Sequence, residues 1–268
     1  MIAQGTPQMI PALSRIWEAC FGDSPEYIRF FMERRFSSCR CFVWLEGEEP
    51  VGAAYLLPCT LGGRPAYYGY AVGVCPEFQR RGICAEILRS AEDYCRQEGA
   101  VFFVLPRPGV EKYYMERSFF PAFFHQFHRF IPVGAPVSGV EFSQVGAEEY
   151  LFLRDSFFRG PGSVTWDMEA VAYALEEQRI CGGFAHVLCW QGKRYLLFGS
   201  KQKETLSIRE TTLPLKELES LVPTLCAHYG VSALVVECPA DSLEEGVPRG
   251  CCWDFVLDVP GWLGLDLA

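Results

Sequence analysis

The sequence predicts a mixed α/β fold of the α+β kind, in which helices flank a mainly antiparallel sheet and a second, smaller domain follows. Half of the 268 residues are hydrophobic and 21% are charged, a balance typical of a packed globular protein. Strand-like segments separated by tight turns favour an antiparallel meander. The order of helices and strands in the first half recurs loosely in the second half, so two domains fit the length better than one.

The first half should open with two amphipathic helices and continue into strands. Between Pro7 and Cys20, apolar residues recur with a period near 3.6, as on one face of a helix. Asp23 to Glu26 is a helix-start pattern with Pro near the first turn, so a second helix should run from Pro25 to about Phe36. Strands bounded by glycine turns should follow over Cys41–Leu45, Val51–Leu57 and Ala66–Val74.

A helix and a buried strand should come next. Ile83–Glu98 places its apolar residues on one helical face, and Gly99 is well placed as the C-terminal cap. Val101–Leu105 is an apolar run rich in Val and Phe, which is typical of a central strand covered on both faces. A short helix over Pro108–Arg117 and a strand over Phe123–Ile131 complete the half. The strand–helix–strand unit should cross over right-handed.

A domain boundary is expected near Pro132–Pro136, where loop and turn residues gather. The first domain would then cover residues 1–136 and the second residues 137–268. The second domain should repeat the order helix, meander, helix, strand, which makes an internal duplication plausible. Its expected helices are Gly146–Phe158, Asp167–Glu177 and Leu215–Tyr229, and its expected strands are His186–Trp190, Tyr195–Ser200, Thr205–Glu210 and Ala233–Glu237.

Charge and cysteine content exclude several classes of protein. Residues 1–136 hold 14 basic and 14 acidic side chains, and residues 137–268 hold 10 and 19, so neither half has the positive balance that duplex binding needs. The 13 cysteines are odd in number and form no C-x-x-C pair, which favours neither a disulfide framework nor a zinc site. The apolar runs are far shorter than the about 20 residues of a membrane span, and no export signal opens the chain. We therefore expect a cytoplasmic protein with no metal, no nucleic-acid partner and no membrane partner.

The segment over residues 71–85 carries the clearest functional pattern. It reads as a strand that ends in a short turn and leads into a helix, whose first turn offers unpaired N–H groups and a positive dipole end to a phosphate. Gly82 lets the backbone approach a ligand closely, and Arg80 and Arg81 add positive charge. Gly73 in mid-strand predicts a bulge that would free main-chain groups for a ligand. These residues together predict an anion-binding site.

This segment resembles the cofactor loop of the GNAT superfamily of acetyl-CoA-dependent N-acyltransferases. The family signature is Q/R-x-x-G-x-G/A after a strand that ends in V-x-P-E-aromatic. Gln79, Gly82 and Cys84 stand at the motif positions, with Cys84 in place of the usual Gly or Ala, and the run from Val74 to Phe78 precedes them. The match covers about residues 10–130 and is similar to the Eis-type bacterial branch, also through Trp17, Phe21–Asp23 and Tyr55–Pro58.

The resemblance implies a GNAT-like fold and acetyl-CoA as the cosubstrate. It also implies that the second half is a degenerate GNAT-like domain, as in tandem members, without the phosphate-binding turn. The residues that it implies for cofactor binding are Val72, Gly73, Val74, Gln79, Arg80, Arg81, Gly82, Ile83, Cys84 and Ala85.

The same resemblance implies a catalytic acid. Residues 111–119 look like the family's F-Y-E-K-L-G-F segment, with Tyr114 at the Tyr position and Ser118 in place of Gly. Tyr114 would protonate the leaving thiolate, and Tyr113 is its competitor. The general base stays open, since the strand over residues 67–70 contains no carboxylate. Water, Glu77, Glu111, His125 or His128 could serve as that base, and Arg107 could meet an anionic part of either ligand.

Two classes of function follow. The first is an N-acyltransferase, a transferase that moves an acetyl group from acetyl-CoA to a primary amine of a small molecule or peptide. The alternative is a non-catalytic acyl-CoA-binding or regulatory protein whose second domain is an interaction module. Cys84 and the missing strand carboxylate favour the alternative, whereas Tyr114 favours the enzyme. The acceptor and the oligomeric state are not encoded in any recognisable pattern.

Overall fold

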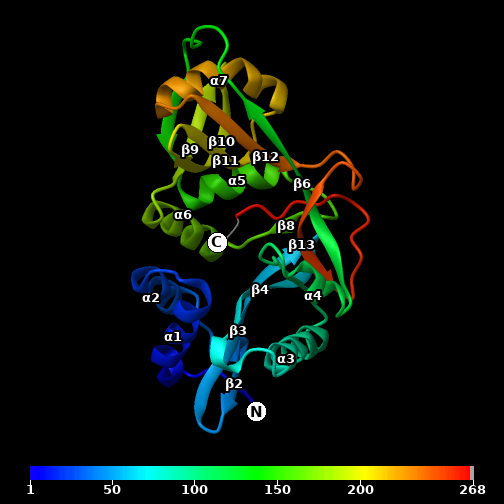
Figure 1. Cartoon of the computed structure of the whole chain (residues 1–268). Coiled ribbons are helices and arrows are strands. Elements are labelled where there is room, and N and C mark those ends of the chain that lie inside the picture. Colours follow the sequence, from blue (N-terminus) through cyan, green and yellow to red (C-terminus); the bar gives the residue numbers. More distant parts are fainter. Residues whose placement is uncertain (266–268) are drawn as a thin grey trace. The chain divides into compact units, whose positions relative to one another are not determined.

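The computed structural model describes residues 1–265, which divide into two compact units (Figure 1). Unit 1 comprises Met1–Pro121 together with Gly250–Val256, and unit 2 comprises the remaining residues, from Ala122 to Arg249 and again from Leu257. Each unit therefore includes residues from the C-terminal part of the sequence. The two units are groups of residues that contact one another, and they do not test a boundary in the sequence. The domain boundary expected between residues 136 and 137 therefore stays a prediction.

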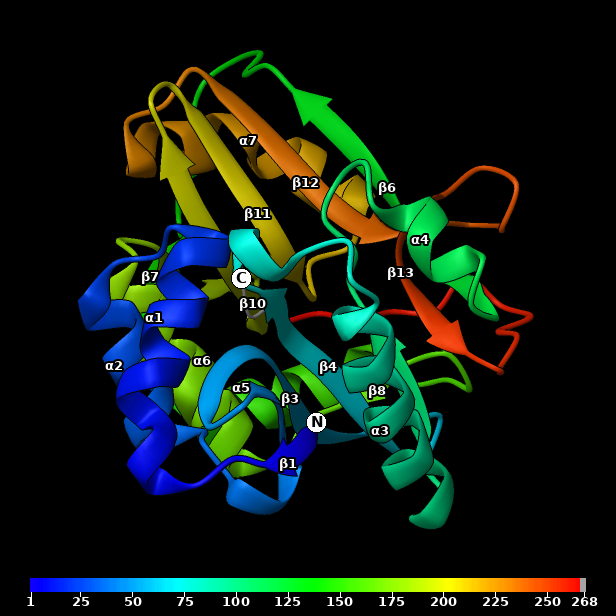
Figure 2. The ribbon, with the colours of Figure 1, turned by 60° about the horizontal axis from the view of Figure 1, so that its bottom comes forward.

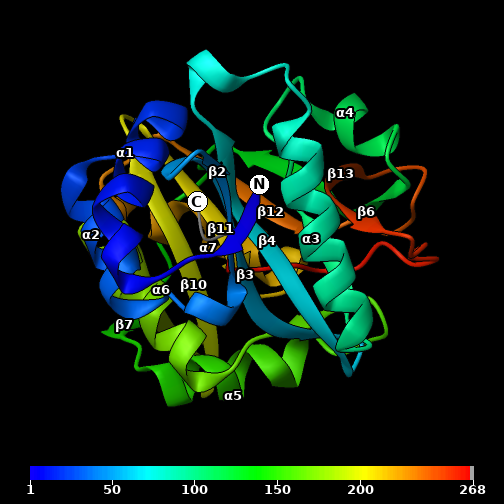
Figure 3. The ribbon, with the colours of Figure 1, turned by 90° about the horizontal axis from the view of Figure 1, so that it is seen from below.

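Unit 1 is a sheet with helices on both faces. Its strands lie in the order β1-β2-β3-β4-β5-β13. All neighbouring pairs are antiparallel except β4 and β5, which are parallel. Figure 3 shows α1 and α2 on one side of β3 and β4, and α3 on the other. The elements are β1 Ile2–Gln4, α1 Ile10–Phe21, α2 Pro25–Arg34, β2 Cys41–Glu46, β3 Glu49–Leu61, β4 Arg64–Val74, α3 Ile83–Gln97, β5 Val101–Val104, α4 Glu111–Met115 and β13 Val247–Trp253, with short 3-10 turns at Pro7–Met9, Ser38–Arg40 and Pro76–Phe78.

Unit 2 repeats this plan with its own strands. Their order is β6-β12-β11-β10-β9-β7, and only β11 and β12 are parallel. Leucines of α7 pack on β10, β11 and β12 in one apolar cluster, and Figure 2 shows the helix beside these strands. The elements are β6 Phe119–Phe130, which begins in unit 1, β7 Glu141–Gln144, α5 Ala147–Phe157, β8 Val164–Thr165, α6 Met168–Ile180, β9 Phe184–Trp190, β10 Lys193–Gln202, β11 Thr205–Thr211, α7 Leu215–Tyr229 and β12 Ala233–Pro239.

The fold class predicted from the sequence is confirmed: a mixed α/β protein with a mainly antiparallel sheet and a second unit of similar plan. The Ser24 hydroxyl accepts from the Tyr27 N–H and so caps α2, as the helix-start pattern predicts. Four strands were not predicted, namely β1, β7, β8 and β13. All 13 cysteines are free thiols, so there is no disulfide framework. Among residues 1–265, none of the helices has the length and apolarity that a membrane span requires.

Candidate functional site

Strands β4 and β5 separate at one point in unit 1. Their parallel register ends at Gly69 opposite Val104, but β4 continues to Val74. Next to this point, the register between β3 and β4 shifts, and Ala71 adopts a left-handed conformation with φ of 47°. A bulge of this kind bends the strand and re-aims its main-chain groups. The predicted bulge is present, but its strained residue is Ala71 rather than Gly73.

Gly73 instead allows the end of helix α1 to pack closely against β4. A Cβ atom at this position would lie 2.9 Å from Cys20 Sγ and 3.1 Å from the ring of Phe21. Any larger side chain would therefore push the end of α1 away from the bulge. Burial raises the pKa of the Cys20 thiol to about 11, so Cys20 stays protonated at neutral pH. Cys20 was not among the predicted site residues, because nothing local in its sequence links it to β4.

The turn after β4 leads directly into the N-terminus of α3. The side-chain amide of Gln79 donates to the Val74 carbonyl at 3.0 Å and closes the turn on the strand. Gly82 precedes the helix with φ of 79°, and a Cβ atom there would meet nothing within 4 Å. Glycine is thus favoured at this position by the backbone conformation, which L residues rarely adopt, and not by crowding. The first N–H groups of α3, from Ile83 onward, have no partner within the helix and can meet an anion.

Two arginines flank this turn. Arg80 is exposed and, with φ of 61°, contributes to the left-handed path of the turn. The Arg81 guanidinium lies 5.1 Å from the centre of the Phe78 ring and 3.9 Å from the Glu46 carboxylate, at the surface. An anion at the end of α3 would therefore meet backbone donors, the dipole of a 15-residue helix and two positive side chains.

Tyr114 lies on α4 and is almost wholly buried, with 8% of its surface exposed. It belongs to the same apolar cluster as Ile83 of α3 and contacts the Phe119 ring edge-on, at 5.3 Å between centroids. Burial, and less strongly the nearby Cys84, raises the pKa of the Tyr114 hydroxyl above its usual range. Tyr114 therefore keeps its proton at neutral pH and can donate a hydrogen bond.

Tyr113 is half-buried and makes a different set of contacts. Burial, and less strongly the Cys84 thiol at the motif position where a small residue is usual, raises the pKa of the Tyr113 hydroxyl above its usual range. The Arg117 guanidinium lies 3.7 Å from the centre of the Tyr113 ring, and its Nη1 donates to the Tyr113 carbonyl at 2.7 Å. Tyr113 thus joins the start of α3 to the end of α4. A side chain so engaged is suited to holding two helices together.

Glu111, His125 and Arg107 have polar partners of their own. Glu111 accepts from the Gly109 N–H at 2.8 Å. His125 lies in unit 2, buried, with Nδ1 2.7 Å from the Glu237 carboxylate. Arg107 donates to the carbonyl of the last turn of α1 at 3.1 Å and stacks on Phe21 at 4.3 Å. Glu77 is exposed, and the ring of His128 stacks on that of Phe130. The identity of the base stays open.

Comparison with known proteins shows which family the first part of the chain resembles. Residues 6–119 match the family model described as the acetyltransferase (GNAT) family, and this stretch contains the bulge, the turn and Tyr114. These residues, which make up less than half of the chain, are similar to that family. No curated protein sequence matches the chain.

Solved structures extend the likeness to the second half. A GCN5-related N-acetyltransferase from Kribbella flavida has a TM-score of 0.70 at 16% identity, over 94% of this chain and 70% of its own. Eis1 from Mycobacterium abscessus has a TM-score of 0.62 at 14% identity, over 88% and 65%. A tandem GNAT protein from the clavulanic acid biosynthesis pathway has a TM-score of 0.54 at 14% identity, over 94% and 96%. At these identities the likeness is one of fold, and it confirms the predicted resemblance to Eis-type and tandem members.

Proposed function

We propose that the protein transfers an acetyl group from acetyl-CoA to a primary amine of a small molecule or peptide. The observation that carries the proposal is the combination of a bulged strand end with a glycine-capped helix N-terminus in a GNAT domain. Val72, Gly73 and Val74 would meet the acyl and pantetheine part through main-chain groups. The turn and first helical residues, Gln79, Arg80, Arg81, Gly82, Ile83, Cys84 and Ala85, would hold the pyrophosphate.

The reaction requires protonation of the leaving sulfur and deprotonation of the attacking nitrogen. The amine nitrogen attacks the thioester carbon, the C–S bond breaks and the CoA thiolate leaves. Tyr114, which burial keeps protonated, would stabilise that thiolate by hydrogen-bond donation and supply its proton. The nitrogen loses its extra proton to a base or to water. Positioning of the two reactants supplies much of the remaining rate enhancement.

The alternative is a protein that binds acyl-CoA without turnover. Two observations favour it: the strand over residues 67–70 has no carboxylate, and Tyr114 is packed among apolar side chains. The 13 free thiols favour a reducing compartment for either function, and the cytoplasm is the proposed one.

One assay separates the two functions. The protein is incubated with acetyl-CoA and a panel of small amines and peptides, and free thiol is measured. We expect thiol release that depends on at least one amine. Tight binding of acetyl-CoA by calorimetry, with no amine-dependent release across the panel, would support the binding protein. Absence of acetyl-CoA binding would refute both.

A further inference from the structure

The end of helix α1 contacts the chain on both sides of the point where β4 and β5 separate. On the β4 side it packs on Gly73, where a Cβ atom would lie 2.9 Å from Cys20 Sγ and 3.1 Å from the ring of Phe21. On the β5 side it meets Arg107, which follows the strand end at Val104 by three residues. Nη1 of Arg107 donates to the Cys20 carbonyl at 3.1 Å. The end of α1 therefore bridges the two strands beyond their last paired residues.

The Arg107 guanidinium makes two further contacts with the same helix end. Its Nη2 atom donates to the Phe21 carbonyl at 3.5 Å, and its centre lies 4.3 Å from the centre of the Phe21 ring. The last carbonyls of a helix lack N–H partners within the helix and carry the negative end of its dipole. The exposed Arg107 side chain thus caps α1 from a distant part of the sequence.

The last turn of α1 is closed by its own hydrogen bonds. Gly22 has a left-handed backbone with φ of 73°, and its N–H donates to the Glu18 carbonyl at 2.8 Å. The indole N–H of the buried Trp17 donates to the Asp23 carboxylate at 2.7 Å, and its ring lies edge-on to that of Phe21 at 6.1 Å. The end of α1 should therefore move as one piece when Arg107 releases it.

Arg107 also begins the turn that leads from β5 to α4. Its carbonyl accepts from the Val110 N–H at 3.1 Å. Gly109 has φ of 91°, and its N–H donates to the Glu111 carboxylate at 2.8 Å. The turn is thus bonded to the start of the helix that carries Tyr114. One side chain, that of Arg107, links this turn to the end of α1.

We infer that Arg107 is a positioning residue that holds the end of α1 against the bulged end of β4 and thereby restricts the acyl group to a short one. The inference rests on the proposed function, in which main-chain groups of residues 72–74 meet the acyl and pantetheine part. Cys20 and Phe21 pack on Gly73, in the middle of that stretch. With the helix end held there, the room beside the thioester is small. Without Arg107, the helix end can move away from β4 and a longer acyl chain gains room.

Three variants separate this role from a general effect of charge. Arg107→Ala removes every contact of the guanidinium, and the exposed position should leave the fold intact. Arg107→Lys keeps a positive donor, and lysine can bind helix-terminal carbonyls: Lys201 does so at the end of α7 in unit 2, with two bonds of 3.0 Å. Arg29→Ala is the matched control, because it removes another exposed arginine of unit 1, 4.0 Å from Glu33 on the surface of α2.

The first readout is the affinity of the full-length protein for acetyl-CoA and for butyryl-CoA, measured by calorimetry. The wild type should prefer acetyl-CoA. In Arg107→Ala this preference should fall by at least about 10-fold, mainly because butyryl-CoA binds more tightly, since room for extra methylene groups changes discrimination by this order. Arg107→Lys should lie between the two, and Arg29→Ala should match the wild type. Loss of stability alone would not change the ratio of the two affinities.

The second readout is hydrogen exchange of the same proteins without ligand. Relative to Arg29→Ala, Arg107→Ala should exchange several-fold faster over residues 17–23 and 105–111, because the end of α1 and the turn before α4 lose their link. Exchange over residues 83–97 should change little. This readout requires neither an acyl-CoA nor an amine.

An unchanged ratio of the two affinities in Arg107→Ala would overturn the inference. An equal loss of affinity for both esters would overturn it as well, because Arg107 would then bind a part that the two ligands share. Unchanged exchange over residues 17–23 would show that Arg107 does not hold the helix end. Failure of the proposed function gives a different result: the wild type binds neither ester, acyl selection falls with it, and exchange still decides whether Arg107 holds α1.

Discussion

The two strand–helix–strand units of this chain differ most at the turn that leads into the helix. In unit 1, eight residues separate Val74 at the end of β4 from Ile83 at the start of α3, whereas in unit 2 three residues separate Thr211 from Leu215. The longer turn passes through two left-handed residues and leaves the helix N-terminus accessible to an anion. The shorter turn has Pro214 immediately before the helix. The proposed phosphate site therefore depends on the longer turn of unit 1 and not on the shared fold alone.

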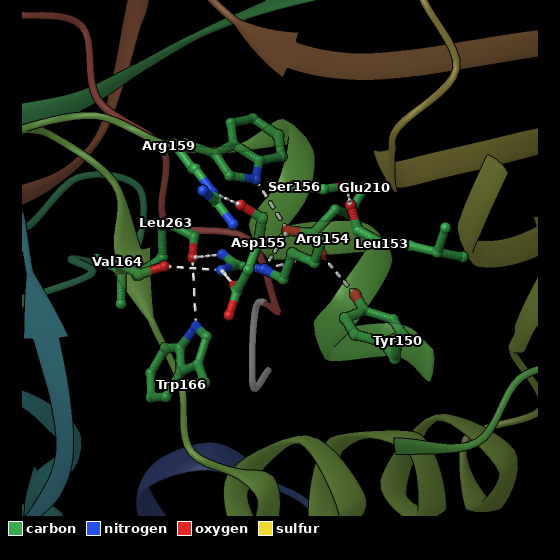
Figure 4. A network of polar contacts seen from close by, with 11 residues as sticks. Tyr150, Leu153, Arg154, Asp155, Ser156, Arg159, Val164, Trp166, Glu210 and Leu263 are labelled. Carbon is green, nitrogen blue, oxygen red and sulfur yellow. Dashed lines mark hydrogen bonds and ion pairs between the residues drawn. The ribbon is translucent and has the colours of Figure 1, made fainter. Parts of the chain in front are cut away.

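The strands that precede these two turns also differ, in their regularity and in their acidic residues. β4 is bulged at Ala71 and carries no carboxylate near its end, whereas β11 carries Glu210. In unit 2 that carboxylate, which is fully buried, accepts from Tyr150 at 2.6 Å as well as from Arg154 (Figure 4). A carboxylate held in this way has a structural role. The acidic strand residue thus occurs in unit 2, whereas the turn proposed to bind the cofactor is in unit 1.

The largest expected effect is the loss of acetyl-CoA binding in Gly82→Asp. The new carboxylate would face the pyrophosphate, and like charges about 4 Å apart cost about 4 kcal/mol at an effective dielectric constant of 20. Calorimetry should therefore show an affinity at least roughly 1,000-fold weaker. Gly47→Asp is the control, because Gly47 has a similar φ of +63° and lies in open space in the β2–β3 turn. Unchanged affinity in a folded Gly82→Asp variant would remove the phosphate from this turn.

The next effect tests Tyr114 against its neighbour. Tyr114→Phe keeps the ring in its core cluster and removes the donor, so turnover should fall about 100- to 10,000-fold with acetyl-CoA affinity nearly unchanged. Tyr113→Phe keeps the ring that stacks with the Arg117 guanidinium and removes only the hydroxyl, so it should behave like the wild type. Steady-state kinetics of both variants checks the assignment. Reversed effects would mean that Tyr113 is the acid, and no loss in either variant would leave Tyr114 as a packing residue.

The Arg154–Glu210 pair of unit 2 should matter for stability. Arg154→Met leaves Glu210 buried without its counter-charge and should lower the free energy of unfolding by about 3–5 kcal/mol. Arg159→Met, at the exposed end of the same segment, should change it by less than about 0.5 kcal/mol. Denaturant titration measures both. Adding Glu210→Met to Arg154→Met should recover part of the loss, and a double variant as unstable as the sum of its parts would contradict a charge-pairing role.

The smallest expected effects are pH-dependent changes in melting temperature, which should have opposite signs for one glutamate of α3 and one of α7. Burial raises the pKa of Glu92 to about 7, so its folded-state pKa exceeds the unfolded value and stability falls as pH rises from about 4.5 to 7. The hydrogen bond from Tyr195 lowers the pKa of Glu217, so its contribution is present above the unfolded pKa and is lost as pH falls through the folded pKa. At pH 8, Glu92→Gln should raise the melting temperature and Glu217→Gln should lower it, with the first difference vanishing near pH 4. Shifts of the same sign at pH 8 would contradict this account.

Much of the fold could be predicted because the sequence patterns that specify it are local. The Gly82 turn and the amphipathic pattern of α3 lie within a few residues of the structures that they specify, and α7 was predicted to the residue. β13 could not be predicted, because Val247–Trp253 includes Pro248 and Gly250 and pairs with a strand about 150 residues earlier. The burial of Arg154 could not be predicted for a different reason: arginine is seldom fully buried, and its partners come from three separate segments.

The central claim is that acetyl-CoA binds at the β4–α3 turn of unit 1 and not at the β11–α7 turn of unit 2. Hydrogen exchange of the full-length protein with and without acetyl-CoA tests it directly. The account predicts slower exchange over residues 72–85 in the presence of the ligand and no change over residues 205–215. Protection over residues 205–215, or ligand binding that leaves residues 72–85 unprotected, would contradict it.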